Sequence, residues 1–183
     1  HLVVEATPKA LSIDVTLDNL YTDYLAGTVR GSFPLDLVVD CANGSAAQVA
    51  PRLFANLGAR VEWLGCAPDG RNINLDCGSL HLERLQKRVI ETSAHLGIAF
   101  DGDADRALFV SASGKVVDGD AVLFLAGSSL KRAGQLPGDL VVATVMSNLG
   151  LERALAAHGI EMTQTPVSNK YVLEEMLRRG RVI

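Results

Sequence analysis

Residues 98–106 read Ile-Ala-Phe-Asp-Gly-Asp-Ala-Asp-Arg, so a short apolar segment runs directly into three aspartates spaced two residues apart, with an arginine behind them. Carboxylate oxygens are hard ligands that suit Mg²⁺ or Ca²⁺. Three carboxylates this close repel one another unless a cation or basic side chains neutralise them. We therefore expect Asp101, Asp103 and Asp105 to form a divalent-metal site on a loop that follows a strand.

On both sides of this loop, short apolar strands alternate with amphipathic helices. Spacing and turn residues predict strands at 35–40, 60–64, 97–100, 107–111, 116–117, 140–144 and 160–164. They predict helices at 49–57, 82–95, 120–133, 149–157 and 170–179. Strands separated by helices imply an α/β fold with mixed, mainly parallel sheets flanked by helices, and the hairpin around residues 111–116 adds an antiparallel element.

The alternation restarts after Pro137-Gly138-Asp139, which predicts a domain boundary. We expect residues 34–135 to form one α/β/α domain and residues 136–183 to form a second, similar domain that is incomplete. Residues 1–33 are less regular and are interpreted as the tail of a preceding domain or a linker helix, with a helix ending near Gly27.

Composition excludes several classes of protein. The formal net charge of −4 over 183 residues argues against nucleic-acid binding, which usually requires a basic face. No apolar run reaches membrane-spanning length, and no signal peptide is visible. The three cysteines, an odd number without a Cys-x-x-Cys pair, are interpreted as reduced thiols in a cytoplasmic protein.

Three other interpretations of the acidic loop remain open. A calcium-binding EF-hand loop would need glycine in place of Arg106 and glutamate in place of Ala112. An aspartyl-phosphate phosphatase would use Asp101 as its nucleophile, but that family usually has Thr or Val in place of Asp105. The loop could also be a solvated turn in which Arg106 pairs with a neighbouring carboxylate.

Several segments, in order along the chain, resemble the α-D-phosphohexomutase superfamily, most closely the bacterial phosphoglucosamine mutases. Asp-Gly-Asp-Ala-Asp-Arg at 101–106 is similar to the family's metal loop. The other matching segments are Val-Asp-Cys-Ala-Asn-Gly at 39–44, Pro-Asp-Gly-Arg-Asn-Ile-Asn at 68–74, Cys-Gly-Ser-Leu-His-Leu-Glu at 77–83 and Thr-Val-Met-Ser-Asn-Leu-Gly-Leu-Glu at 144–152. The resemblance implies that residues 34–135 are domain II and residues 136–183 part of domain III.

The resemblance also implies an activity. Phosphoglucosamine mutases interconvert glucosamine 6-phosphate and glucosamine 1-phosphate through a phosphoserine and a bisphosphate intermediate, for UDP-N-acetylglucosamine synthesis. Asp101, Asp103 and Asp105 would hold Mg²⁺, and Arg106 would contact the phosphoryl group. Lys170 and His81 would contact the phosphosugar substrate, although His81 could be structural and Lys170 an ordinary helix lysine.

The family's Ser-His-Asn-Pro nucleophile segment and its Gly-Glu-x-Ser-Gly sugar loop do not occur in this sequence. We therefore expect a fragment that is inactive alone and active as part of a longer enzyme. The alternatives are a phosphoglucomutase or phosphomannomutase, and a non-catalytic metal- or phosphate-binding module. Ser168-Asn169 stands where the family often has Gly-Asp. Without the glycine, the family's backbone conformation is not predicted for this loop. Oligomeric state is not indicated.

Overall fold

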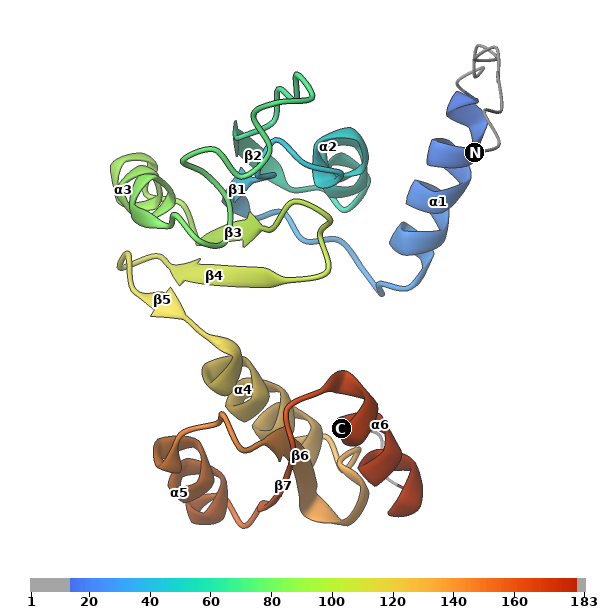
Figure 1. Ribbon diagram of the computed structural model, residues 1–183, viewed down its shortest axis with the longest axis vertical. Coiled ribbons are helices and arrows are strands. Elements are labelled where there is room, and N and C mark those ends of the chain that lie inside the picture. The colour runs from blue at the N-terminus through green and yellow to red at the C-terminus, as the bar shows by residue number, and fades with distance from the viewer. Residues whose placement is uncertain (1–13, 181–183) are drawn as a thin grey trace, which may run out of the picture. The chain divides into compact units, whose positions relative to one another are not determined.

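The computed structural model describes residues 14–180 and confirms the predicted alternation of strands and helices over this range (Figure 1). The chain divides into two units, the first comprising residues up to 107 with 112–114, and the second comprising 108–111 with the residues from 115 onward. Predictions for residues 1–13 and 181–183 lie outside the described residues. None of the helices within 14–180 combines the length and the hydropathy needed to span a membrane.

The first unit is built on three parallel strands in the order β2-β1-β3. They are β1 (Asp36–Asp40), β2 (Arg60–Leu64) and β3 (Leu96–Phe100). The central strand is apolar on consecutive residues, and Val38 and Val39 are both 0% exposed. Successive strand side chains point to opposite faces, so both faces of β1 must be covered.

Two helices provide that cover, because α2 (Ala46–Asn56) and α3 (Glu83–Thr92) lie on either side of the strands (Figure 1). Leu85 and Val89 of α3 are fully buried. A Cβ at Gly97 of β3 would lie 2.7 Å from Val89, so α3 packs directly on the backbone of that strand. This is the α/β/α layering that the sequence predicts.

Helix α2 contains a proline whose missing donor is compensated by a thiol. Pro51 has no N–H, so the carbonyl of Ala47, four residues earlier, loses its helical partner. The Cys66 thiol donates to this carbonyl at 3.6 Å. Cys41 and Cys77 are buried, and all three cysteines are free thiols.

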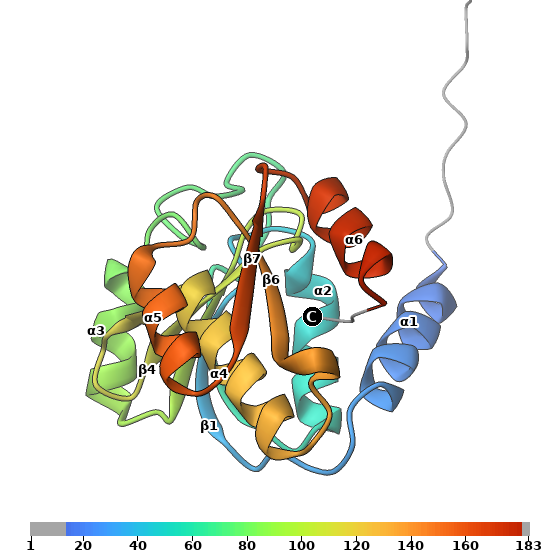
Figure 2. The same cartoon turned by 90° about the horizontal axis from the view of Figure 1, so that it is seen from below.

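Helix α1 (Val15–Gly27) ends at the predicted residue and lies beside α2 (Figure 2). An ion pair of 2.9 Å joins Asp23 of α1 to Arg52 of α2. Leu17, Leu20 and Tyr24 of α1 are exposed, so the helix has an apolar surface that the described residues leave open.

A hairpin of β4 (Ala107–Ser111) and β5 (Val116–Val117) leads into the second unit, which includes the hairpin except for Ala107 and the turn at 112–114. The other elements are α4 (Gly119–Arg132), a 3₁₀ turn at Pro137–Asp139, β6 (Leu140–Thr144), α5 (Leu149–Ala157), β7 (Glu161–Thr165) and α6 (Asn169–Arg178). Strands β6 and β7 are parallel and lie between α5 and α6 (Figure 2). Leu136, Val141, Leu151, Leu155 and Ile160 form the buried core.

The prediction for the helix at 82–95 was wrong at its C-terminal end. Helix α3 stops at Thr92 because Ser93 adopts a left-handed conformation with φ of 54°. The chain then reverses, and the backbone N–H of Ala94 donates to the carbonyl of Val89 at 3.0 Å. Ala94 is buried, but it lies beyond the helix.

Ser93→Gly is expected to raise the free energy of unfolding by about 0.5–1 kcal/mol, because glycine adopts the left-handed cap without the steric penalty of a Cβ. Urea unfolding measures the change. Thr92→Gly, one residue earlier and inside the helix, is the matched control and should lower the free energy of unfolding by about the same amount. Equal effects of the two substitutions would contradict the left-handed cap.

Candidate metal site

The three predicted aspartates come together on one loop. Asp101 directly follows β3, at the edge where the carboxyl ends of the parallel strands meet. Asp101, Asp103 and Asp105 each offer a carboxylate oxygen, and these oxygens all lie within 4.8 Å of one another. Asp101 is 4% exposed, whereas the other two aspartates are exposed. The cluster therefore has one carboxylate buried in the fold and two that face solvent.

Arg106 closes this loop onto Asp101. The backbone N–H of Arg106 donates to Oδ1 of Asp101 at 3.1 Å, and Nε donates to Oδ2 at 2.7 Å. The backbone N–H of Asp101 donates back to the carbonyl of Arg106 at 3.2 Å. Nε also lies 3.5 Å from Asp105, and the Arg106 side chain is 70% exposed. The guanidinium group can thus hold the loop with Nε while its outer amino groups reach toward a ligand.

The closeness of the charged groups in the loop shifts the pKa values of two of its carboxylates. Burial raises the pKa of Asp101, but the hydrogen bonds from the backbone and side chain of Arg106 oppose this, and the net pKa lies below its usual value. The pKa of Asp105 is raised by its hydrogen bond to Asp101 and by the charge of Asp103. Crowding therefore disfavours the ionised form of Asp105, and a bound cation would act in the opposite direction.

A turn after β1, residues 41–45, supports the loop from one side. The backbone N–H of Ser45 donates to the carbonyl of Gly102 at 2.9 Å. A Cβ at Gly44 would overlap the carbonyl oxygen of Gly102 and lie 2.8 Å from its Cα. Residues 39–44 resemble a segment of the family, but the resemblance does not predict that two glycines bring the backbones into contact. No local pattern signals such an approach.

The segment 66–80 supports the loop from another side. A Cβ at Gly102 would lie 2.7 Å from Ile73 and 2.9 Å from Asn74. The backbone N–H of Asn74 donates to the carbonyl of Ala42 at 2.8 Å, and that of Ser79 donates to the carbonyl of Phe100 at 2.9 Å. The segments that follow the three parallel strands are thus joined by backbone hydrogen bonds.

His81 follows this supporting segment and is exposed. Its backbone N–H donates to the carbonyl of Gly78 at 3.1 Å, which places it in the first unit with the aspartates. Contact of His81 with a substrate stays a prediction.

Lys170 lies in the second unit, in the first turn of α6. Its ammonium group lies 3.8 Å from Glu174 and 5.8 Å from the centre of the Tyr171 ring. Ser168 has φ of 174°, extended backbone that any residue adopts, and its side chain accepts from the backbone N–H of Lys170 at 3.2 Å. The loop therefore needs no glycine at position 168, and substrate contact by Lys170 stays a prediction.

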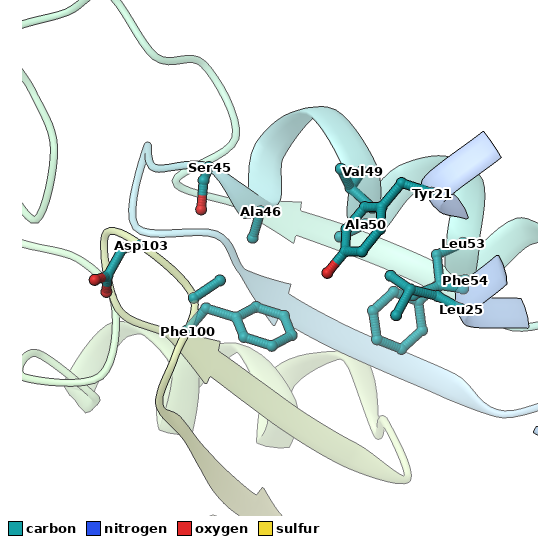
Figure 3. A pocket seen from close by; sticks show the side chains of 11 residues that line it. Tyr21, Leu25, Ser45, Ala46, Val49, Ala50, Leu53, Phe54, Phe100 and Asp103 are labelled. Carbon is teal, nitrogen blue, oxygen red and sulfur yellow. The ribbon is translucent and has the colours of Figure 1, made fainter. Parts of the chain in front are cut away.

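A hollow of about 280 Å³ opens beside the acidic loop (Figure 3). Asp103 and Ser45 lie at one end, Phe100 lies between, and Tyr21 and Leu25 of α1 lie at the other end. Most of the remaining lining comes from apolar side chains of α2. No pattern in the sequence predicts this hollow, because it depends on how α1 and α2 pack.

Comparison with known proteins identifies the family of this chain. The family profile described as phosphoglucomutase/phosphomannomutase, alpha/beta/alpha domain II, matches residues 18–114, and the profile for domain III matches residues 118–183. A phosphoglucosamine mutase from Solibacter usitatus is 55% identical over an alignment of 183 positions, and the match covers 98% of this chain. The chain spans 41% of the length of that relative.

Two solved structures show the same fold. A phosphoglucomutase/phosphomannomutase family protein from Burkholderia thailandensis has a TM-score of 0.77 and 30% identity, and the match covers 92% of this chain and 36% of that one. An N-acetylphosphoglucosamine mutase from Aspergillus fumigatus, solved in complex with GlcNAc-6P and magnesium, has a TM-score of 0.63 and 20% identity over 89% of this chain and 36% of its own. The chain belongs to the phosphoglucomutase/phosphomannomutase family.

Proposed function

We propose that Asp101, Asp103 and Asp105 hold Mg²⁺ and that this chain is the metal-binding part of a phosphoglucosamine mutase. The observation that carries the proposal is the set of three carboxylate oxygens within 4.8 Å of one another on a single loop. Ligand-binding loops of parallel α/β sheets lie at the carboxyl ends of the strands, where this loop lies. Identity of 55% to a phosphoglucosamine mutase supports the choice of activity.

The donor set fits magnesium. Carboxylates are hard ligands, and three protein oxygens leave positions in an octahedral shell for water and phosphate oxygens. Calcium usually takes more protein oxygens than this loop offers, so Mg²⁺ is preferred. When bound, the metal would neutralise charge on a phosphoryl group during its transfer.

Other residues would bind and orient the substrate. Arg106 would donate from its exposed guanidinium to phosphoryl oxygens. His81 and Lys170 are exposed side chains that would contact the phosphosugar. The serine that carries the phosphoryl group, and the loop that reads the sugar, would belong to the longer enzyme.

We also propose that residues 34–135 and 136–183 correspond to domains II and III of that enzyme. The family profiles meet between residues 114 and 118, while the predicted boundary follows the change of pattern near 136. A cytoplasmic location is proposed on the three free cysteines among residues 14–180.

A mutase assay on the full-length enzyme that contains this chain tests the proposal. The kcat/KM for glucosamine 1-phosphate should exceed that for glucose 1-phosphate by at least about tenfold, because a site that hydrogen-bonds an amino group discriminates against its replacement. EDTA should abolish turnover, and added Mg²⁺ should restore it. A preference for glucose 1-phosphate would contradict the amino-sugar assignment, and turnover that persists in EDTA would contradict the metal. No turnover with either sugar would favour a non-catalytic module.

A further inference from the structure

Asp40, the last residue of β1, is a carboxylate that is 0% exposed. Its Oδ1 accepts a hydrogen bond from the backbone N–H of Ala42 at 2.9 Å. Its Oδ2 has no hydrogen-bond partner among the residues that the structure describes. A buried oxygen without a partner is unfavourable, so Oδ2 does not account for an aspartate at this position. This points to a role for the hydrogen bond that Oδ1 makes.

That hydrogen bond holds a turn of unusual backbone conformation. Ala42 and Asn43 are consecutive left-handed residues with φ of 55° and 48°, a conformation that residues with a Cβ rarely adopt. An aspartate that accepts from the backbone two residues ahead stabilises such a turn. Gly65 leaves room for it, since a Cβ there would overlap Oδ1 of Asp40.

The turn ends against the acidic loop. Its conformation brings the backbone N–H of Ser45 to the carbonyl of Gly102, 2.9 Å away, between Asp101 and Asp103. The hydrogen bond from the Ala42 N–H to Asp40 fixes Ala42 at the start of the turn. The hydrogen bond from the Ser45 N–H fixes Gly102 at its end. Asp40 can therefore influence the spacing of the aspartates although it is not itself one of the cluster.

We infer that Asp40 is a positioning residue for the metal site: by accepting from the Ala42 N–H, it holds residues 41–45 in the conformation in which Ser45 fixes Gly102. The inference rests on the proposed metal function and extends it. Asp40 does not need to contact the metal or the substrate for this role. Outer residues that orient metal ligands commonly change metal affinity by about 10–100-fold when they are replaced.

The test compares Asp40→Ala, Asp40→Asn and Val38→Ala in the 183-residue chain. Amide hydrogen exchange of Ser45, measured by NMR without metal, reports the Ser45–Gly102 hydrogen bond. Calorimetric titration with MgCl₂ reports metal affinity. Val38 is also 0% exposed on β1, so Val38→Ala weakens the same strand without removing the acceptor of the turn.

Asp40→Ala should speed Ser45 exchange and weaken Mg²⁺ binding by at least about tenfold. Asp40→Asn keeps an oxygen for Ala42 and should stay within about twofold of the unmodified chain in both measurements. Val38→Ala should lower the melting temperature and leave both measurements unchanged. If Asp40→Ala does not fold, Asp40→Leu removes the acceptor while filling the space with apolar atoms, and the same changes are expected.

Unchanged Ser45 exchange in Asp40→Ala or Asp40→Leu would overturn the inference. The inference would also be overturned if Val38→Ala changed Ser45 exchange and Mg²⁺ affinity as much as Asp40→Ala does, at the same loss of melting temperature. If the unmodified chain bound no Mg²⁺ while Ser45 was protected, the proposed metal function would be wrong. Ser45 exchange in the Asp40 variants would then still decide whether Asp40 holds the turn.

Discussion

Asp101→Asn is expected to weaken Mg²⁺ binding to this chain by at least about 100-fold, because residues that only orient metal ligands change the affinity by about 10–100-fold. Asp101 is the buried member of the cluster, and both of its oxygens accept from Arg106. Asparagine keeps the shape but removes the charge. It also turns one acceptor into an N–H donor, which would face Nε of Arg106 if it replaced Oδ2. Calorimetric titration with MgCl₂ measures the change, and mutase turnover of the full-length enzyme should fall with it.

Asp76→Asn is the matched control for this substitution. Asp76 is exposed and lies in the same unit, so its replacement removes one negative charge without altering the cluster. Asp76 has φ of 51°, and asparagine tolerates that conformation. Magnesium affinity should stay within about twofold of the unmodified chain, because Asp76 is exposed and solvent screens its charge. If Asp101→Asn bound Mg²⁺ as tightly as this control, the metal-loop hypothesis would be wrong.

Gly44→Ala is expected to lower the free energy of unfolding by about 2–3 kcal/mol, the upper part of the range for inserting an atom where none fits. The added Cβ would overlap the carbonyl oxygen of Gly102, and backbone cannot move aside as a flexible side chain can. Because the turn and the acidic loop would have to separate, Mg²⁺ binding should weaken as well. Urea unfolding and calorimetric titration measure the two effects.

Gly27→Ala is the control for this prediction. Gly27 is the last residue of α1, and a Cβ there would meet nothing within 4 Å. Alanine favours helix over glycine, so stability should stay equal or rise by up to about 1 kcal/mol. A Gly44→Ala variant as stable as Gly27→Ala would show that the two backbones do not touch in solution.

The elements and the aspartate cluster could be predicted from sequence because both depend on residues close together in the chain. Apolar spacing predicted β2, β4, β6 and α5 with their observed bounds. Asp101, Asp103 and Asp105 lie within five residues, so a single turn is enough to bring their oxygens together. The end of α3 was missed because Ser93 carries no strong signal for a left-handed cap.

The contacts that support the loop could not be predicted, because they join residues that are far apart in the chain. Gly44 and Gly102 are far apart in the chain, and their contact depends on how the ends of β1 and β3 are aligned in the sheet. The role inferred for Asp40 depends on the same alignment. The residues around each glycine are those of an ordinary turn and do not mark it as a contact site. Side-chain pattern predicts what an element buries, but it does not predict where two backbones meet.

The contact between Gly44 and Gly102 also bears on protein engineering. It is made by main-chain atoms, so the anchor of the acidic loop does not depend on the side chains at 103–105. Those three positions can therefore be varied in a redesign for another metal ion while Gly102 and its partner stay fixed. The turn at 41–45 and the loop at 101–106 could be transplanted together into another parallel sheet. A loop transplanted without the turn would lose the backbone contact that holds Gly102.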